Sequence, residues 1–401
     1  MKKQLLLLPL LAIAMTGCKG SGKSASEITL SIWEDESNIE MVQALCDDFL
    51  AEYRQNFPNS PKIKIEFTSQ AEKSAVEEMA RGVSESGNGP DIAAVTHDTI
   101  ASGVDNKIIA PISYSDAIKH RMTPEALNSV TVDGVVYGYP ITAESTTIMY
   151  DSTKVSAAEL SSFDALLASG KKLSWTLTGD NGGYYTWGLY TDSVLFGASG
   201  KDASAVNIGT DKSSQNVLDF FKKYGSCFVD ESPEDAVSGV SGTVGLVSSP
   251  FILSSMQKAY GNKLKLAKLP TINGESLRPF SGYKAYIVSR YSKNASLAQE
   301  LCNYLTSYDA NLYRLKNAGY LPACPLDATP EIAAEIANTE QSQVFSASLA
   351  DSMVMPNISE MNNFWRPMNN ASTYFKENAA SLDLATVKTK LNEVTSTLLG
   401  Q

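Results

Sequence analysis

The fold is decided by residues 28–95, which begin Ile28-Thr29-Leu30-Ser31-Ile32-Trp33-Glu34 and end Ile92-Ala93-Ala94-Val95. Apolar and polar residues alternate at the start, as they do in a half-buried strand. A second alternating run follows at 63–67, and residues 92–95 read as a buried strand. Between the first two strands, apolar residues recur with helical spacing at Val42, Leu45, Cys46, Phe49, Leu50 and Tyr53. A second helix, which carries Glu77 and Glu78, is expected before the third strand. This β-α-β-α-β order predicts a parallel sheet with helices on both faces.

Acidic residues follow two of the predicted strands. Glu34, Asp35 and Glu36 come at the end of the first strand, and Asp98 comes after the third. In open α/β sheets, ligands bind beyond the carboxyl ends of the strands. We therefore expect these carboxylates near a binding site, with Glu34, Asp35 and Glu36 taken as a group.

The first seventeen residues have the pattern of an export signal. Lys2 and Lys3 precede a short apolar run, and Thr16-Gly17 leads into Cys18. The run is too short to remain as a membrane span. Its end is similar to the lipidation signal of bacterial lipoproteins. We expect residues 1–17 to be a signal peptide, Cys18 to carry lipid, and the Gly/Ser/Lys-rich residues 18–27 to be a flexible tether outside the cytoplasmic membrane.

Composition limits the classes of partner. A chain of 401 residues suits two domains after loss of the signal peptide. The net charge of −11 argues against nucleic acid or an anionic membrane surface as the partner. After Cys18, the cysteines lack C-x-x-C or metal-ligand spacing, so no metal is expected. Buried free thiols are favoured over disulfides for Cys46, Cys227, Cys302 and Cys324.

An aromatic segment lies within the Gly- and Thr-rich residues 169–200. It reads Gly182-Gly183-Tyr184-Tyr185-Thr186-Trp187. These rings either belong to the core or form a platform for sugar rings, whose C–H faces pack on aromatic faces. Both interpretations stay open for Trp187, and Tyr184 is the stronger candidate for a platform.

Four ordered sequence blocks span almost the whole mature chain. The blocks are Gly89-Pro90-Asp91-Ile92 with His97-Asp98, Tyr139-Pro140-Ile141-Thr142-Ala143-Glu144, Leu269-Pro270-Thr271 with Pro279-Phe280 and Gly282, and Met355-Pro356-Asn357-Ile358 with Met361 and Phe364-Trp365. In sequence and spacing they resemble the maltose/maltodextrin-binding family of extracellular solute-binding proteins of ABC importers.

The resemblance implies a periplasmic-binding-protein-like α/β fold. Two doubly wound α/β lobes would be joined by hinge crossovers, with a ligand cleft between them. One lobe would take residues 28–142 and 286–335, and the other residues 143–285 and 336–401. The chain would bind an oligosaccharide, with malto-oligosaccharides as the first candidates, and deliver it to ABC permease subunits. It would be a monomer without cofactor or catalytic residues.

The resemblance also assigns binding positions. Asp98 and Glu144 would accept sugar hydroxyls, Tyr184 and Trp365 would stack on sugar rings, and the remaining candidates would line the cleft. These remaining candidates are Glu77, Glu78, Phe251, which replaces a Trp of the family, and Arg366, which replaces a Tyr. Val95, Thr99 and Gly182 depart from family positions that contact sugar, so the preferred glycan and its length stay open.

Other classes of function remain as alternatives. A glycoside hydrolase would also need an aromatic cleft and two carboxylates, about 5–5.5 Å apart for retention or about 6.5–9.5 Å for inversion. A binder of peptides or polyamines is a further alternative.

Overall fold

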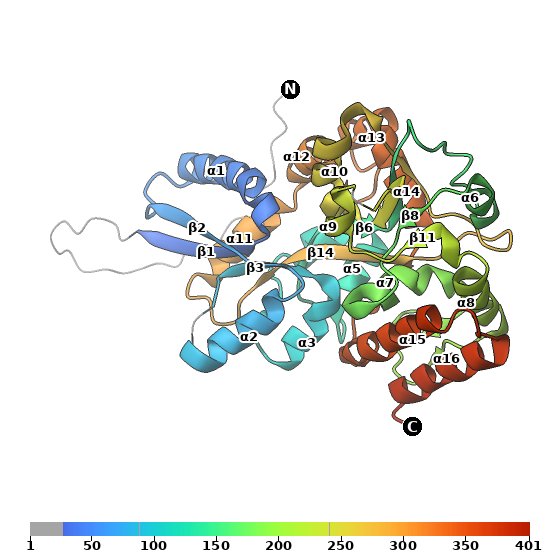
Figure 1. The fold of residues 1–401 in the computed structure, drawn as a ribbon. Helices are drawn as coiled ribbons and strands as arrows, with labels where there is room; N and C mark the ends of the chain where they lie inside the picture. Colours follow the sequence, from blue (N-terminus) through green and yellow to red (C-terminus); the bar gives the residue numbers. More distant parts are fainter. Residues whose placement is uncertain (1–26, 88, 240) are drawn as a thin grey trace.

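The computed structural model describes residues 27–87, 89–239 and 241–401. The predicted signal peptide, Cys18 and nearly all of the predicted tether lie outside these residues. Within them, most strands belong to two separate sheets, each with its own helices (Figure 1). No helix of this described part is long and apolar enough to cross a membrane.

The first sheet has the order β2-β1-β3-β14-β6-β15. β16 pairs with the start of β14, whereas β3 pairs with the end of that strand. β1 is parallel to β2 and β3, which confirms the predicted parallel β-α-β-α-β unit. β14 runs antiparallel to β3 and β6. The strands are β1 (Ile28–Glu34), β2 (Ile63–Ser69), β3 (Ile92–Thr96), β6 (Tyr139–Ser145), β14 (Phe280–Val288), β15 (Leu321–Pro322) and β16 (Met353–Val354).

The second sheet has the order β11-β8-β12-β7-β13. β8 is parallel to β11 and β12, whereas β7 is antiparallel to β12 and β13. The strands are β7 (Thr147–Asp151), β8 (Leu173–Ser174), β11 (Phe228–Val229), β12 (Gly245–Ser248) and β13 (Leu264–Ala267). Short hairpins pair β4 (Thr131–Val132) with β5 (Val135–Val136) and β9 (Val194–Leu195) with β10 (Val206–Asn207).

Helices cover both faces of the first sheet, with α1 and α2 on opposite sides of β1–β3 (Figure 1). α1 buries Val42, Leu45, Cys46 and Phe49, as its sequence periodicity predicts. The helices around this sheet are α1 (Ile39–Asn56), α2 (Ala75–Ser86), α3 (Ile100–Asp105), α4 (Ser115–Arg121), α5 (Pro124–Ser129), α11 (Ala295–Leu305), α12 (Tyr308–Ala318) and α13 (Pro330–Asn338).

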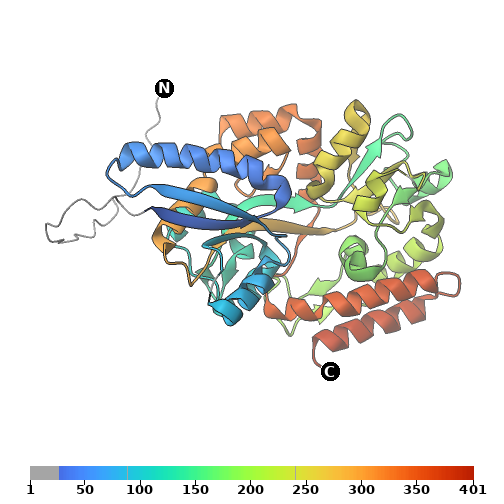
Figure 2. The same ribbon diagram turned by 60° about the vertical axis from the view of Figure 1, so that its left-hand side comes forward.

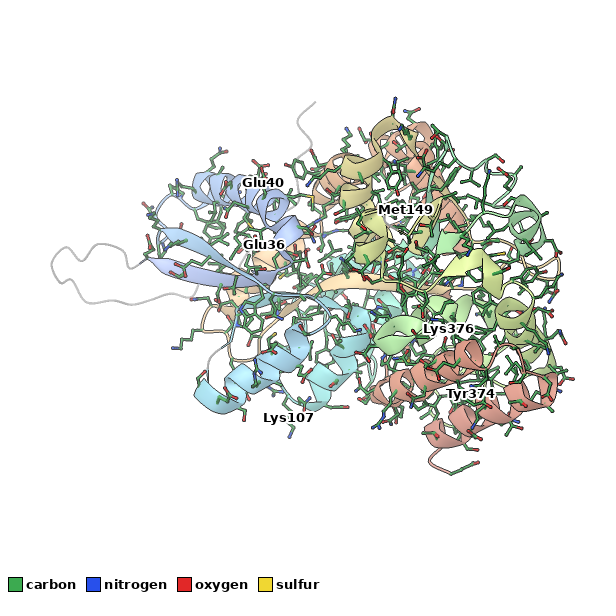
Figure 3. The ribbon with its side chains drawn as sticks, viewed as in Figure 1. Glu36, Glu40, Lys107, Met149, Tyr374 and Lys376 are labelled. Atoms are coloured by element: carbon green, nitrogen blue, oxygen red, sulfur yellow. The ribbon has the colours of Figure 1, made fainter. Side chains whose placement is uncertain are left out.

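The helices of the second sheet include the C-terminal pair α15 and α16, which lie side by side (Figure 2). Lys376 of α15, which is labelled in Figure 3, forms an ion pair with Asp230, the residue that follows β11. This set comprises α6 (Phe163–Ser169), α7 (Gly182–Thr186), α8 (Asp211–Lys222), α9 (Pro233–Val237), α10 (Leu253–Tyr260), α15 (Trp365–Glu377) and α16 (Leu384–Leu398). α14 (Glu340–Ala350) contacts strands of both sheets.

The chain passes between the sheets at short crossing segments. It leaves the first sheet at the end of β6 and enters the second at β7, with only Thr146 between. It returns through β14 and crosses again through α14 and β16. We refer to each sheet with its helices as the first and the second lobe. The predicted lobe ranges 28–142 with 286–335 and 143–285 with 336–401 stay a prediction, and two of their boundaries fall inside β6 and β14.

The cysteines of the described residues belong to the packed interior. Cys46, Cys227, Cys302 and Cys324 are buried free thiols, which confirms the favoured prediction. Burial raises the pKa of Cys324 to about 11 and that of Cys46 well above its ordinary value. The thiols therefore stay protonated and unreactive at neutral pH.

Candidate binding site between the lobes

A cavity of about 430 Å³ is lined by residues of both lobes. The first lobe contributes the carboxyl ends of β1 and β3 together with β6 and β14. The second lobe contributes α7, α15, the start of α9 and the segment before α10. The lining side chains include Asp35, Glu72, Lys73, Asp98, Glu144, Asn181, Tyr184, Tyr185, Glu234, Phe251, Lys284, Tyr320 and Trp365.

Several residues that the sequence predicted for the site meet in this cavity. Asp35, Asp98 and Glu144 line it from the first lobe. Tyr184, Phe251 and Trp365 line it from the second lobe, and Phe251 keeps 39% of its surface exposed. Among these predicted residues, the carboxylates come from the first lobe and the aromatic rings from the second.

The group after β1 divides into three different environments. Asp35 lines the cavity, and its Oδ1 accepts a hydrogen bond from the Ser37 backbone N–H at 3.0 Å. Glu36 is exposed near the start of α1 (Figure 3). Glu34 does not line the cavity and is only 2% exposed. Of the three, only Asp35 can reach a ligand in this cavity.

Buried Glu34 has hydrogen-bond partners behind the cavity. Its Oε2 accepts from the Tyr286 hydroxyl at 2.9 Å, and its Oε1 accepts from the Asp35 backbone N–H at 3.1 Å. Arg314 in turn donates to the Tyr286 hydroxyl at 3.4 Å. Burial, with a contribution from the Glu72 carboxylate, raises the pKa of Glu34 to about 7. Glu34 is therefore a supporting residue beneath Asp35.

Glu77 and Glu78 do not line the cavity, although the sequence placed them there. α2 buries Ala75, Val76 and Met79 against the first sheet, so residues 77 and 78 lie off this face. Glu77 is exposed, and Glu78 forms an ion pair with Arg81. The segment before α2 instead brings Glu72 and Lys73 to the cavity.

Arg366 also lies away from the cavity. It is exposed and lines a separate hollow between α15 and α16. Trp365, its neighbour, lines the cavity because successive helical residues are about 100° apart around the axis. The predicted hydroxyl contact from Arg366 has no counterpart in this geometry.

Aromatic rings form the second-lobe wall of the cavity. The ring centres of Tyr184 and Trp365 are 6.5 Å apart, and that of Trp365 lies 6.2 Å from Phe280. Trp187 is fully buried and stacks on Phe280 at 4.7 Å, so the core interpretation holds for this ring. Tyr184 lines the cavity, as expected for the platform interpretation.

Asp98 presents an unsatisfied acceptor at the cavity. Among the described residues, its Oδ1 is buried and has no hydrogen-bond partner. Tyr184 faces the same space, and burial, with the Glu144 carboxylate, raises its pKa well above the ordinary value. The site therefore offers carboxylate acceptors and a neutral phenol to a ligand.

Other residues of the sequence blocks hold together the first sheet and the crossing segment that follows β16. Asp91 Oδ2 accepts from the Ser31 backbone N–H at 2.9 Å and thereby joins β3 to β1. His97 Nε2 contacts the Met355 carbonyl at 2.8 Å, and its Nδ1 accepts from the Tyr283 N–H at 3.1 Å. Asn357 bonds the Ala101 N–H at 3.0 Å and the Ser129 carbonyl at 2.8 Å. These contacts fix the backbone around Asp98.

Sequence reasoning missed several residues that line the cavity, among them Glu72, Lys73, Asn181, Glu234, Lys284 and Tyr320. Lys73 Nζ donates to Asn181 Oδ1 at 3.1 Å, which joins the two lobes beside the cavity. A usable signal existed only for Lys284, which is the one charged residue within the apolar and aromatic strand β14. Burial alone would lower the pKa of Lys284, but Glu72 and Glu144 raise it.

The two-lobed fold with this cavity between the lobes defines a class of protein that captures small solutes. The chain belongs to the bacterial extracellular solute-binding protein family, whose sequence model matches residues 44–340. The family inferred from the sequence blocks is thereby confirmed.

Similar proteins carry sugar-related names. The galactooligosaccharide-binding protein of Bacillus subtilis is 25% identical, with 90% of this chain and 88% of that protein covered. The maltooligosaccharide ABC transporter solute-binding lipoprotein of Streptococcus pneumoniae is 24% identical, with 71% of each chain covered. The ligand-free maltodextrin binding protein MalE1 from L. casei has the same fold, with a TM-score of 0.78, 18% identity and coverage of 93% of this chain and 99% of that one.

Proposed function

We propose that this protein captures oligosaccharides outside the cytoplasmic membrane for an ABC importer. The observation that carries the proposal is the cavity between the lobes, which is lined by both carboxylates and aromatic rings. Carboxylates accept hydrogen bonds from sugar hydroxyls, and the rings offer apolar faces to the C–H faces of the sugar. Asp98, which lines the cavity, is a candidate acceptor for such a hydroxyl.

The charges of the cavity argue against an anionic ligand, and its mixture of carboxylates, ammonium groups and aromatic rings suits a neutral polyhydroxylated one. The ammonium groups of Lys73 and Lys284, which both line the cavity, can donate hydrogen bonds to the oxygens of such a ligand. An anionic ligand would meet Asp35, Glu72, Asp98, Glu144 and Glu234. Like charges brought together in a desolvated site cost binding free energy.

Malto-oligosaccharides are the first candidate ligands. The sequence blocks resemble those of maltodextrin binders, and one relative is named for maltooligosaccharides. Another relative is named for galactooligosaccharides, so binding should be measured for both malto- and galactooligosaccharides. A preference for the galacto-series would correct the sugar while leaving the class of protein unchanged.

Capture proceeds by closure of the lobes about the crossing segments. A sugar stabilises the closed form because it then contacts the carboxylates of one lobe and the rings of the other. In the structure, the Lys73–Asn181 hydrogen bond joins the two lobes beside the cavity. The closed form is delivered to permease subunits in the membrane, and the protein acts as a monomer without cofactor.

The aromatic wall provides the test of the proposed ligand class. Trp365→Ala should weaken binding of maltotriose by about 1–3 kcal/mol, because the sugar loses one large apolar face. Isothermal titration calorimetry with the purified mature protein measures this change. The matched control is Arg366→Ala, which changes the next residue of α15, and its affinity should equal that of the wild type.

Two outcomes would contradict this assignment. Unchanged affinity of Trp365→Ala for every glycan that the wild type binds would remove Trp365 from the site. Loss of affinity in Arg366→Ala, but not in Trp365→Ala, would support the contact between Arg366 and the sugar that the sequence predicted. A thermal unfolding curve for each variant shows that it is folded.

The site is proposed to bind sugar without cleaving it. A hydrolase needs one of its two carboxylic acids to stay protonated near neutral pH as a general acid. Incubation of the protein with maltotriose, followed by chromatography for glucose and maltose, tests this point. Products that disappear in Glu144→Gln would overturn the binder interpretation in favour of a hydrolase.

Lipid attachment at Cys18 is proposed from the sequence, and the name of one relative as a lipoprotein supports it. Cys18→Ser should release the protein from the membrane fraction, because no thiol remains to be acylated. Fractionation of expressing bacterial cells, with mass spectrometry of the N-terminal peptide, measures the outcome. Cys46→Ser is the control and should stay in the membrane fraction. A wild-type N-terminus without acyl groups would refute the anchor.

A further inference from the structure

The wall contributed by the first lobe contains an ion pair that the sequence did not predict. Lys284 Nζ lies 2.7 Å from Glu72 Oε2, and both residues line the cavity. Their side chains are only 12% and 10% exposed. A buried ion pair of this kind is weak evidence for stability, because desolvation offsets much of the attraction. Its place at the cavity suggests that it serves binding.

The pair retains hydrogen-bonding capacity that faces the cavity. An ammonium group has three N–H donors, and a carboxylate accepts through both oxygens. Among the described residues, Glu72 is the hydrogen-bonding partner of Lys284, while the Tyr320 ring lies 5.9 Å from its Nζ. Lys284 therefore keeps donors for a ligand, and Glu72 keeps an acceptor beside them.

Strand register places this pair next to Glu144. Lys284 pairs with Thr142 and Gly282 pairs with Glu144 on the neighbouring strands β14 and β6. Residues two apart on a strand point to the same face, so Lys284 and Glu144 are diagonal neighbours. Gly282 between them has no side chain, and even an added Cβ would meet only ordinary contacts of 3.8–3.9 Å. Gly282 lines the cavity together with these charged groups, so no side chain at this position separates them from a ligand.

We propose that Lys284 and Glu72 together bind two neighbouring hydroxyl groups of one sugar ring and thereby determine specificity. The Lys284 ammonium donates to the oxygen of one hydroxyl, and the next hydroxyl donates to the Glu72 carboxylate. Such a donor–acceptor pair recognises a vicinal diol and discriminates against a ring that lacks either hydroxyl. This inference rests on the proposed oligosaccharide function and extends it to residues outside the resemblance.

The first experiment measures affinity for maltotriose by calorimetry. Lys284→Met and Glu72→Gln should each weaken binding about tenfold to a hundredfold, the scale of a hydrogen bond to a charged group. The matched control is Lys265→Met, which removes a lysine that pairs with Glu340 on the exposed surface of the second lobe. Its affinity should stay at the wild-type value.

The second experiment separates direct contact from structural support. Monodeoxy analogues of maltotriose are titrated into the wild type and each variant. If Lys284 contacts a hydroxyl, the analogue without that hydroxyl binds the wild type more weakly but binds Lys284→Met as well as the parent sugar does. A purely structural role would weaken the parent and every analogue by the same factor, and this result would overturn the inference.

Failure of the inference is distinguishable from failure of the proposed function. Wild-type protein that binds maltotriose, together with unchanged affinity in Lys284→Met and Glu72→Gln, would refute the role of the pair alone. Wild-type protein that binds neither malto- nor galactooligosaccharides would refute the oligosaccharide function. If Lys284→Met does not fold, Glu72→Gln can replace it, because glutamine keeps the shape of the side chain. The monodeoxy analogues are then compared with the parent sugar in the wild type and in Glu72→Gln.

Discussion

Trp187→Ala is expected to lower the free energy of unfolding by about 3–5 kcal/mol, as truncation of a buried aromatic residue does. The ring of Trp187 is fully buried and stacks on Phe280 with a centre separation of 4.7 Å and an interplanar angle of 2°. Tyr190 packs on the same ring at 5.2 Å. The indole N–H has no partner among the described residues, so the loss comes from packing.

Urea denaturation, followed by circular dichroism, measures this loss. Trp365→Ala is the matched control because it removes the same kind of ring from the cavity wall and should leave most of the stability in place. The two substitutions should therefore have different effects. Trp187→Ala should lower stability, and Trp365→Ala should lower sugar affinity. Equal destabilisation by both substitutions would contradict the assignment of Trp187 to the core and Trp365 to the site.

Glu34→Gln is expected to remove a pH dependence of stability worth about 3 kcal/mol in total, the free-energy equivalent of the pKa shift. Burial raises the pKa of Glu34 from 4.5 to about 7 in the folded chain. The folded state therefore binds the proton more tightly than the unfolded state does. The resulting stabilisation is fully present below about pH 4.5, falls as the pH rises, and is lost above about pH 7.

Denaturation of the wild type and the variant at pH 5 and pH 8 measures the effect. The glutamine side chain of the variant stays neutral at both values, so the wild type should lose roughly 2–3 kcal/mol more than the variant between them. Ionisable groups distant from Glu34 contribute equally to both proteins and cancel in the comparison. Glu36→Gln, which changes an exposed neighbour, should keep the wild-type pH dependence. The same pH dependence in Glu34→Gln and the wild type would show that Glu34 does not carry it.

Local patterns determined the elements of the first lobe. The alternation in residues 28–34 and the helical spacing from Val42 to Tyr53 predict β1 and α1, because the period of the apolar residues selects the element that can bury them. The order of elements then predicts parallel strands, and β1–β3 are parallel in the structure. The sequence blocks identified the family, to which the chain belongs.

The sequence was less reliable for the orientation of individual helical residues. The resemblance implies that Glu77 and Glu78 line the cleft, yet the buried face of α2 consists of Ala75, Val76 and Met79. A helix changes direction by about 100° at each residue, so the rotation of α2 about its axis decides which side chain faces the cavity. The same rotation separates Trp365 from Arg366 on α15.

The sequence by itself determined the parallel β-α-β-α-β unit, the family, and the carboxylate and aromatic types that a sugar site requires. Only the tertiary structure brought Glu72 to Lys284, although these two residues lie far apart along the chain. Glu72 lies in a loop before α2 without a recognisable pattern, and Lys284 reaches the cavity because β14 inserts between β3 and β6. Hydrophobic periodicity specifies which face of a strand is buried, but the order of strands in a sheet is set by packing between distant segments.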